Sequence, residues 1–127
     1  MTTAAVLLEA LADYLRHEVQ PGTDGAAAYK ARIAINLLQM LAREEALGPQ
    51  LRALDADAAS ALALDPVEPL PDLARALRDG RVFDECALLE FLRRRAILQL
   101  DIDNPRYASL ADARARWAEG SAEQQED

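Results

Sequence analysis

The chain has few of the residues from which metal sites and disulfides are built. It contains one cysteine, Cys86, and one histidine, His17, among its 127 residues. A single cysteine permits neither an internal disulfide nor a cysteine cluster, and a single histidine rules out the paired histidines of common zinc sites. We interpret His17 as a helix-surface residue and Cys86 as a small buried hydrophobe. We therefore expect no metal ion and no cofactor.

Basic residues are outnumbered by acidic ones, which excludes two classes of partner. The 14 Lys and Arg residues face 22 Asp and Glu residues, so the formal net charge is −8. The segment 119–127 holds four of those acids and no base, which leaves −4 for residues 1–118. A protein that binds a phosphate backbone needs a basic patch or stripe, and this sequence has none. We expect neither nucleic acid nor an anionic membrane surface as a partner.

Long hydrophobic runs are also missing. No stretch approaches the roughly 20 apolar residues that a membrane-spanning helix needs. The first residues, MTTAAVLLEA, lack the basic start of a secretory signal. We expect a cytoplasmic protein. Lys30 is the one lysine among the basic residues, and the abundance of Arg and Ala favours a bacterial source with GC-rich codons.

The composition favours a helical fold. Aromatic residues make up only 5% of the chain, whereas 51% of its residues are hydrophobic. The core must then consist mainly of Leu, Ile, Val and Ala, which suits helices better than sheets. We predict an all-α, single-domain bundle of five to six helices in residues 1–118, followed by a disordered acidic tail in residues 119–127. The expected helices span residues 3–18, 26–47, 49–64, 72–79, 85–102 and 110–118.

Glycine, proline and aspartate mark the expected helix ends. Gly48 and Pro49 end the second helix, and Pro49 begins the third. The segment 65–71, DPVEPLP, holds three prolines and is expected to be non-helical. Asp84 is a typical N-cap residue for the fifth helix.

Apolar side chains cover most sides of the second and fifth helices, so we expect these two helices to be central. In the first helix the expected inward stripe consists of Leu7, Leu8, Leu11 and Leu15. The second helix leaves one polar stripe, which is either its wet side or part of a polar pocket or partner surface. That stripe consists of Arg32, Asn36, Gln39 and Arg43. In the fifth helix Arg95 lies among leucines, where it needs a carboxylate or carbonyl oxygens to offset its desolvation.

The segment 100–107, LDIDNPRY, is the densest polar motif in the chain. Its Asp-x-Asp is typical of phosphatases only where a buried strand feeds a loop, whereas here the preceding apolar run continues a helix. An EF-hand loop is excluded because proline stands at a ligand position and the glycine is missing. A structural interpretation remains, in which Pro105 ends the helix and Asn104 caps the next turn. Arg106 would then reach a carboxylate, and Tyr107 would be largely buried.

Two blocks of the sequence resemble a known family. LDIDNPRY is similar to the C-terminal signature of an uncharacterised bacterial domain-of-unknown-function family. Residues 31–37, ARIAINL, with Arg43-Glu44 and Leu47-Gly48, resemble its second block, and the two blocks with their spacing cover most of residues 3–107. The resemblance implies a small all-helical protein without an assigned activity. Its genes neighbour those of proteins resembling aminoglycoside phosphotransferases and acyl-CoA dehydrogenases, which implies an accessory role in acyl-CoA or phosphotransferase-type catabolism.

Two functions are compatible with the sequence. The first is a non-catalytic accessory or interaction module that binds a protein partner or a second copy of itself. The alternative is a binding protein or enzyme for a small carboxylate or phosphate ligand, held in a cleft rich in Arg, Asn and Tyr. The candidate polar cluster, whether ligand-binding or structural, consists of Arg32, Asn36, Arg95, Asp103, Asn104, Arg106 and Tyr107. The first function is favoured, since no catalytic triad, metal set or phosphate loop is found.

Overall fold

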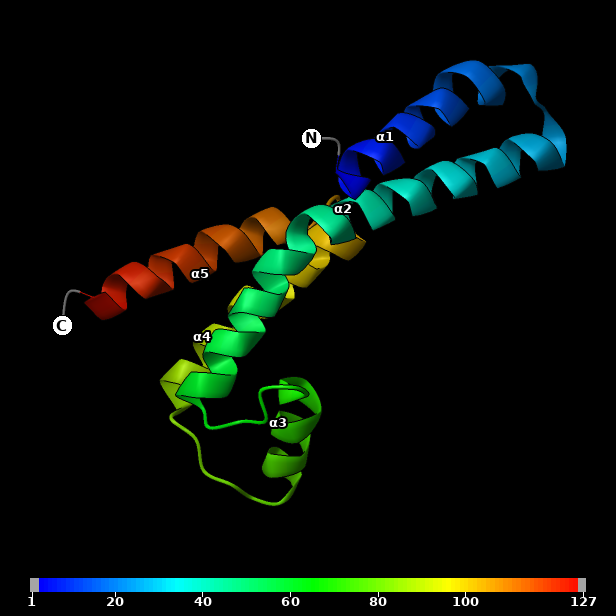
Figure 1. The fold of residues 1–127 in the computed structure, drawn as a ribbon. Helices are drawn as coiled ribbons and strands as arrows, with labels where there is room; N and C mark the ends of the chain where they lie inside the picture. The colour runs from blue at the N-terminus through cyan, green and yellow to red at the C-terminus, as the bar shows by residue number, and fades with distance from the viewer. Residues whose placement is uncertain (1–2, 126–127) are drawn as a thin grey trace. The chain divides into compact units, whose positions relative to one another are not determined.

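The structure, a computed structural model, describes the backbone of residues 3–125 and the side chains of residues 3–117. Within that range it holds five α-helices and no strand, which confirms the all-α prediction (Figure 1). The helices are α1 (Ala4–Tyr14), α2 (Gly25–Ala61), α3 (Pro69–Arg78), α4 (Glu85–Asp103) and α5 (Leu110–Gln125). The chain forms two compact units, residues 1–49 and residues 50–127.

The longest helix, α2, contradicts one predicted boundary. Pro49 was expected to end the second helix and begin a third, but it lies inside a continuous helix of 37 residues. A proline inside a helix removes one backbone hydrogen bond and costs about 3 kcal/mol. Apolar packing on both sides outweighs that local cost, because Ala42 and Gly48 are buried before the proline and Ala58 and Ala59 after it.

Unit 1 is a helical hairpin. α1 continues into the π-helical turn η1 (Leu15–Val19) and the 3-10 turn η2 (Gln20–Gly22). The chain then reverses, and the first part of α2 runs back alongside α1 (Figure 1). Thr3 caps α1, since its hydroxyl accepts a hydrogen bond from the Val6 amide at 3.3 Å. The seam of the hairpin is short, and its buried residues are Ala12, Ile35 and Ala42.

Unit 2 has its own core. Parts of α2, α3 and α4 surround it, and its buried residues are Ala58, Ala59, Leu62, Leu64, Leu73 and Phe91. The three helices contribute to a core of only six buried residues, so each helix is buried along one seam only. The two helices predicted to be central therefore keep large exposed side chains, such as Leu37 on α2 and Leu89 on α4.

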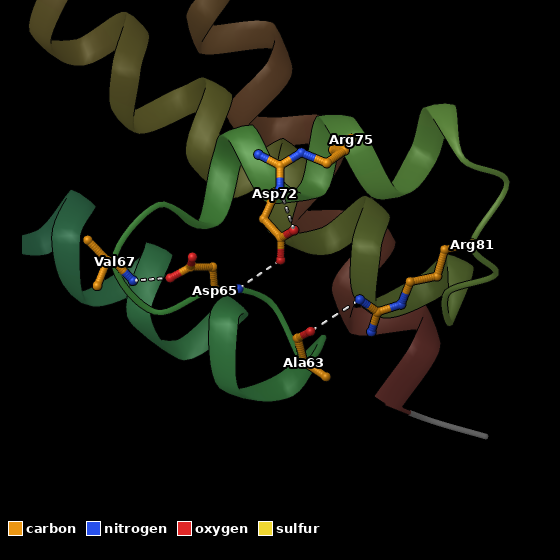
Figure 2. Close-up of polar contacts among 6 residues, drawn as sticks. All are labelled: Ala63, Asp65, Val67, Asp72, Arg75 and Arg81. Atoms are coloured by element: carbon orange, nitrogen blue, oxygen red, sulfur yellow. Dashed lines mark hydrogen bonds and ion pairs between the residues drawn. The ribbon is translucent and has the colours of Figure 1, made fainter.

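The end of α2 is closed by a left-handed residue and an arginine. Ala63 has a φ of 53°, a conformation that usually belongs to glycine. The Leu64 amide donates back to the Ala59 carbonyl at 2.8 Å, as in a Schellman motif. Arg81 donates to the carbonyl oxygen of Leu62 at 2.6 Å. It also donates to the carbonyl oxygen of Ala63 at 3.1 Å (Figure 2). The two carbonyls that directly follow α2 are thus satisfied by a side chain from beyond α3.

Replacing Ala63 with glycine should stabilise unit 2 by about 0.5–1 kcal/mol, because the left-handed conformation costs a residue with a Cβ more than the glycine loses in unfolded-chain freedom. Urea denaturation followed by circular dichroism measures this. Gly80 is the matched control: its φ is 79° and a Cβ there would meet no atom within 4 Å. Gly80→Ala should therefore destabilise through the backbone alone. A loss of stability in Ala63→Gly would contradict the strain at this position.

Polar contacts shape the turn between α2 and α3. The Asp65 amide donates to Asp72 Oδ2 at 2.9 Å, and the Val67 amide donates to Asp65 Oδ1 at 2.9 Å (Figure 2). Residues 65–68 are non-helical as predicted, but α3 begins at Pro69, three residues before the expected start. The prediction was wrong for Pro69 and Pro71 because first-turn amides need no helical partner, so proline fits there.

The remaining elements agree more closely with the sequence. α4 begins at Glu85, and Asp84 accepts hydrogen bonds from the amides of Cys86 and Ala87, at 3.0 and 3.3 Å. Cys86 itself is exposed, so its prediction as a buried hydrophobe is wrong. The first turn of α4 projects it outward from the seam that holds Phe91. α5 continues to Gln125, past the predicted end at residue 118, and residues 126–127 of the expected disordered tail lie outside the described range.

Candidate functional site

Arg95 forms an ion pair with the carboxylate of Asp55, as expected for an arginine that lies among leucines. Its Nε donates to Asp55 Oδ1 at 3.0 Å and its Nη2 to Asp55 Oδ2 at 3.4 Å. The two side chains are 21% and 19% exposed, so the pair joins α4 to α2 in a partly dry environment. Asp55 was not among the predicted residues, because it lies 40 positions away and no local pattern connects it to Arg95. This arginine stabilises unit 2, and its charge is already matched.

Replacing Arg95 with alanine should cost about 1–3 kcal/mol, because it leaves the Asp55 carboxylate without its partner in a partly buried place. Urea denaturation gives the value. The double variant Asp55→Ala/Arg95→Ala should recover part of the loss, as a double-mutant cycle requires for a direct contact. The exposed neighbour Arg94, paired with Glu90, is the control and should cost less than about 1 kcal/mol. Equal losses at the two arginines would contradict the assignment.

The Asp-Asn-Pro-Arg-Tyr block forms a surface turn after α4. The Asn104 amide donates to the Leu100 carbonyl at 2.7 Å, and the Tyr107 amide donates to the Asn104 carbonyl at 3.0 Å. Tyr107 is 49% exposed, so the prediction that it is largely buried is wrong. Arg106 is exposed as well, and it pairs with no carboxylate within residues 3–117. Backbone hydrogen bonds close the turn, and the side chains are left pointing outward.

The predicted polar cluster does not assemble inside unit 2. Arg95 is held by Asp55, and Asp103 accepts a hydrogen bond from Gln99 at 3.1 Å. Among the described residues, no side-chain hydrogen bond or ion pair joins Arg95, Asp103, Asn104, Arg106 and Tyr107 to one another. A neighbouring ion pair, between Asp101 and Arg114, connects α4 to α5.

The other two predicted residues belong to unit 1. Arg32 and Asn36 are exposed on α2, and the Arg32 guanidinium lies 5.7 Å from the ring centre of Tyr29, one turn earlier on the same helix. The other two residues of the stripe, Gln39 and Arg43, are half-buried.

Unit 2 carries a groove of about 400 Å³ between α2 and α4. Its floor is apolar and includes Ala58, Leu62 and Phe91, and its charged residues are Asp57, Glu90 and Arg94. Since Arg94 is paired with Glu90, the groove has a surplus of negative charge. This lining disfavours the carboxylate or phosphate ligand of the alternative hypothesis.

Unit 1 carries the larger unexplained surface. Leu7 and Leu11 were predicted to point inward but are 55% and 52% exposed, while Ala12 occupies the seam. The same-side residues of α2 are exposed too, among them Leu37 at 51%. We call this surface the apolar face, and it consists of Leu7, Leu11, Tyr14, Ile33, Leu37 and Leu41. A leucine stripe indicates that one side of a helix packs against something, but it does not identify what covers that side. For this reason the sequence alone wrongly assigned Leu7 and Leu11 to the interior.

Helical geometry places the two rows on one side of the hairpin. At about 100° per residue, Leu7 and Leu11 lie roughly 100° from the buried row of α1, in the direction of decreasing residue number. Leu37 and Leu41 are offset from the buried row of α2 in the same direction. When two antiparallel helices face each other, equal offsets in one direction point to the same side. The polar stripe that contains Arg32 is offset the other way, so the hairpin has one apolar and one polar face.

Within residues 3–117 no polar or charged side chain is buried, and no group of His, Cys, Asp and Glu side chains could hold a metal ion. Over the same part of the chain, no helix combines the length and the apolar character required to cross a membrane.

Comparison with known proteins gives a family without an activity. The family described as "Domain of unknown function (DUF6285)" matches residues 21–107, which is more than half of the chain and includes both blocks noted in the sequence. No curated protein and no solved structure matches. With its five helices and the match over α2, α3 and α4, the chain belongs to the DUF6285 family, as an uncharacterised small helical protein.

Proposed function

We propose that this protein is a non-catalytic interaction module and that the apolar face of unit 1 is its docking surface. The observation that carries the proposal is that six large apolar side chains, each 40–57% exposed, form an exposed row along each of the two helices of a hairpin. Soluble proteins rarely leave such a contiguous surface uncovered, and those that do use it for binding. A hairpin whose seam buries three residues also gains little stability by itself, so covering the apolar face would stabilise it.

The setting of this module follows from the family resemblance. We place it in the bacterial cytoplasm, beside enzymes of acyl-CoA or phosphotransferase-type catabolism, where it acts as an accessory protein without a metal ion or cofactor. The excess of acidic residues supports a protein partner over nucleic acid.

Site-specific photo-crosslinking in living cells tests the docking surface. A photoreactive amino acid at position 37 lies on the apolar face, and the same amino acid at position 36 is the matched control on the polar side. We expect covalent protein adducts from position 37 and few from position 36. If position 37 gives no more adducts than position 36, the apolar face is not a docking surface and the proposal fails.

The alternative function, a small-anion binder, receives less support. Two of its predicted residues in unit 2, Arg95 and Asp103, are engaged with separate partners, and the groove of unit 2 carries more carboxylates than arginines. Isothermal titration with inorganic phosphate and acetate tests it, and saturable binding that Arg94→Ala abolishes would restore this alternative.

A further inference from the structure

We propose that the partner of the apolar face is a second copy of the same chain, and that the two α2 helices pair antiparallel about Leu37. This inference rests on the proposed function and names the partner. A two-fold axis through Leu37 would bring each hairpin's apolar face against the other, giving four helices around a shared core.

The spacing of residues along α2 carries this arrangement. Ile33 and Leu41 each lie four residues from Leu37, and Lys30 and Glu44 each lie seven residues from it. Steps of four and seven residues stay on one side of a helix. In an antiparallel pair centred on Leu37, that leucine meets its own copy, Ile33 meets Leu41, and Lys30 meets Glu44. This row of α2 can therefore pack against the same row of a second, antiparallel copy, with apolar residues opposite apolar ones and lysine opposite glutamate.

Charge selects the antiparallel orientation over the parallel one. Lys30, the only lysine in the chain, and Glu44 are both exposed, and no ion pair within the described residues engages either of them. The antiparallel pair forms two Lys30–Glu44 contacts, one at each end of the interface. A parallel pair in register would instead oppose lysine to lysine and glutamate to glutamate, which is unfavourable.

The exposed apolar area is more than half of what each subunit of a standard dimer contributes. Six side chains that are each about half exposed present on the order of 500 Å² of apolar surface per subunit, against the ~800 Å² that each partner contributes to a standard interface. Neighbouring small and polar residues at the edges supply the remainder. We therefore expect the dimer to have moderate affinity, and we expect the charges of Lys30 and Glu44 at the ends of the interface to influence which partner binds.

Charge-reversal variants test the pairing by sedimentation velocity, with circular dichroism as the check on folding. The unmodified chain should sediment as a dimer at concentrations on the order of tens of micromolar. Lys30→Glu and Glu44→Lys should each weaken the dimer by about tenfold or more, because each variant opposes like charges at both ends. An equimolar mixture of the two variants should recover the dimer, since both contacts then join opposite charges. Arg32→Glu, on the polar face of the same helix, is the control and should leave the dimer intact.

Leu37→Glu extends the test to the centre of the interface, where it would oppose two carboxylates and should abolish the dimer. The charge variants keep the proposal falsifiable if Leu37→Glu perturbs folding. A monomeric unmodified chain, a dimer that the charge variants do not weaken, or a mixture that does not recover would overturn the antiparallel pairing. If the chain is monomeric while position 37 crosslinks to another protein, the docking function stands and self-pairing fails. If it is monomeric and gives no adducts, both proposals fail.

Discussion

Replacing Phe91 with alanine should destabilise unit 2 by about 3–5 kcal/mol. Phe91 is 6% exposed and lies on α4 in the core that it shares with Ala58, Ala59 and Leu62. Its ring is the largest of the six buried side chains of this core, and two of its three named neighbours are alanines. Small side chains on helices cannot move in to fill a void, so the lost transfer free energy and the cavity cost add together.

Urea denaturation followed by far-UV circular dichroism measures the loss at Phe91. Leu89→Ala is the matched control, because Leu89 lies on the same helix and is 47% exposed. It should cost much less. Similar losses for the two variants would mean that Phe91 is not the centre of this core.

Replacing Leu73 with alanine should cost about 2–5 kcal/mol and should act mainly on α3. Leu73 is the one fully buried residue of α3, at 4% exposure, and Leu70 on the same helix is a partly buried side chain that packs against the core, so this short helix depends mainly on Leu73 for its contact with the core. Hydrogen exchange read by mass spectrometry should show the amides of residues 69–78 opening before those of α4. Leu77→Ala, at a position that is 48% exposed, should leave their protection nearly unchanged. Uniform loss of protection across unit 2 in Leu73→Ala would show that α3 is not a separate cooperative element.

The sequence predicted those features whose causes are local. α4 begins where Asp84 offers its carboxylate to two amides and ends before Pro105, so both of its ends follow from neighbouring residues. The continuity of α2 could not be predicted in this way, because the local cost of Pro49 is offset by apolar contacts distant in sequence. The need of Arg95 for a carboxylate was evident, whereas its partner Asp55 became evident only once α2 and α4 were packed together.

The candidate surface shows the same division between local and distant causes. Leucines at helical spacing correctly indicated that α1 and α2 have apolar sides, but Leu7 and Leu11 were assigned to the interior because a single domain was expected to cover them. The short seam of Ala12, Ile35 and Ala42 leaves them outside. Tyr107 was misplaced for a related reason: a turn closed by backbone hydrogen bonds needs no buried ring to hold it.

Arg81 connects the two ends of the segment that contains α3. The backbone leaves α2 at Leu62 and Ala63, forms α3, and returns to Arg81. The Arg81 side chain donates hydrogen bonds to the carbonyls of those same two residues, and Figure 2 shows the one to Ala63. The segment between them is thus a closed loop, and the hydrogen bonds that close it do not involve the side chains inside the loop. Closing a longer loop costs only about 0.6 kcal/mol for each doubling of length. The length and sequence between these ends can therefore vary at little cost in loop-closure entropy, provided that a side chain still fills the place of Leu73 in the core.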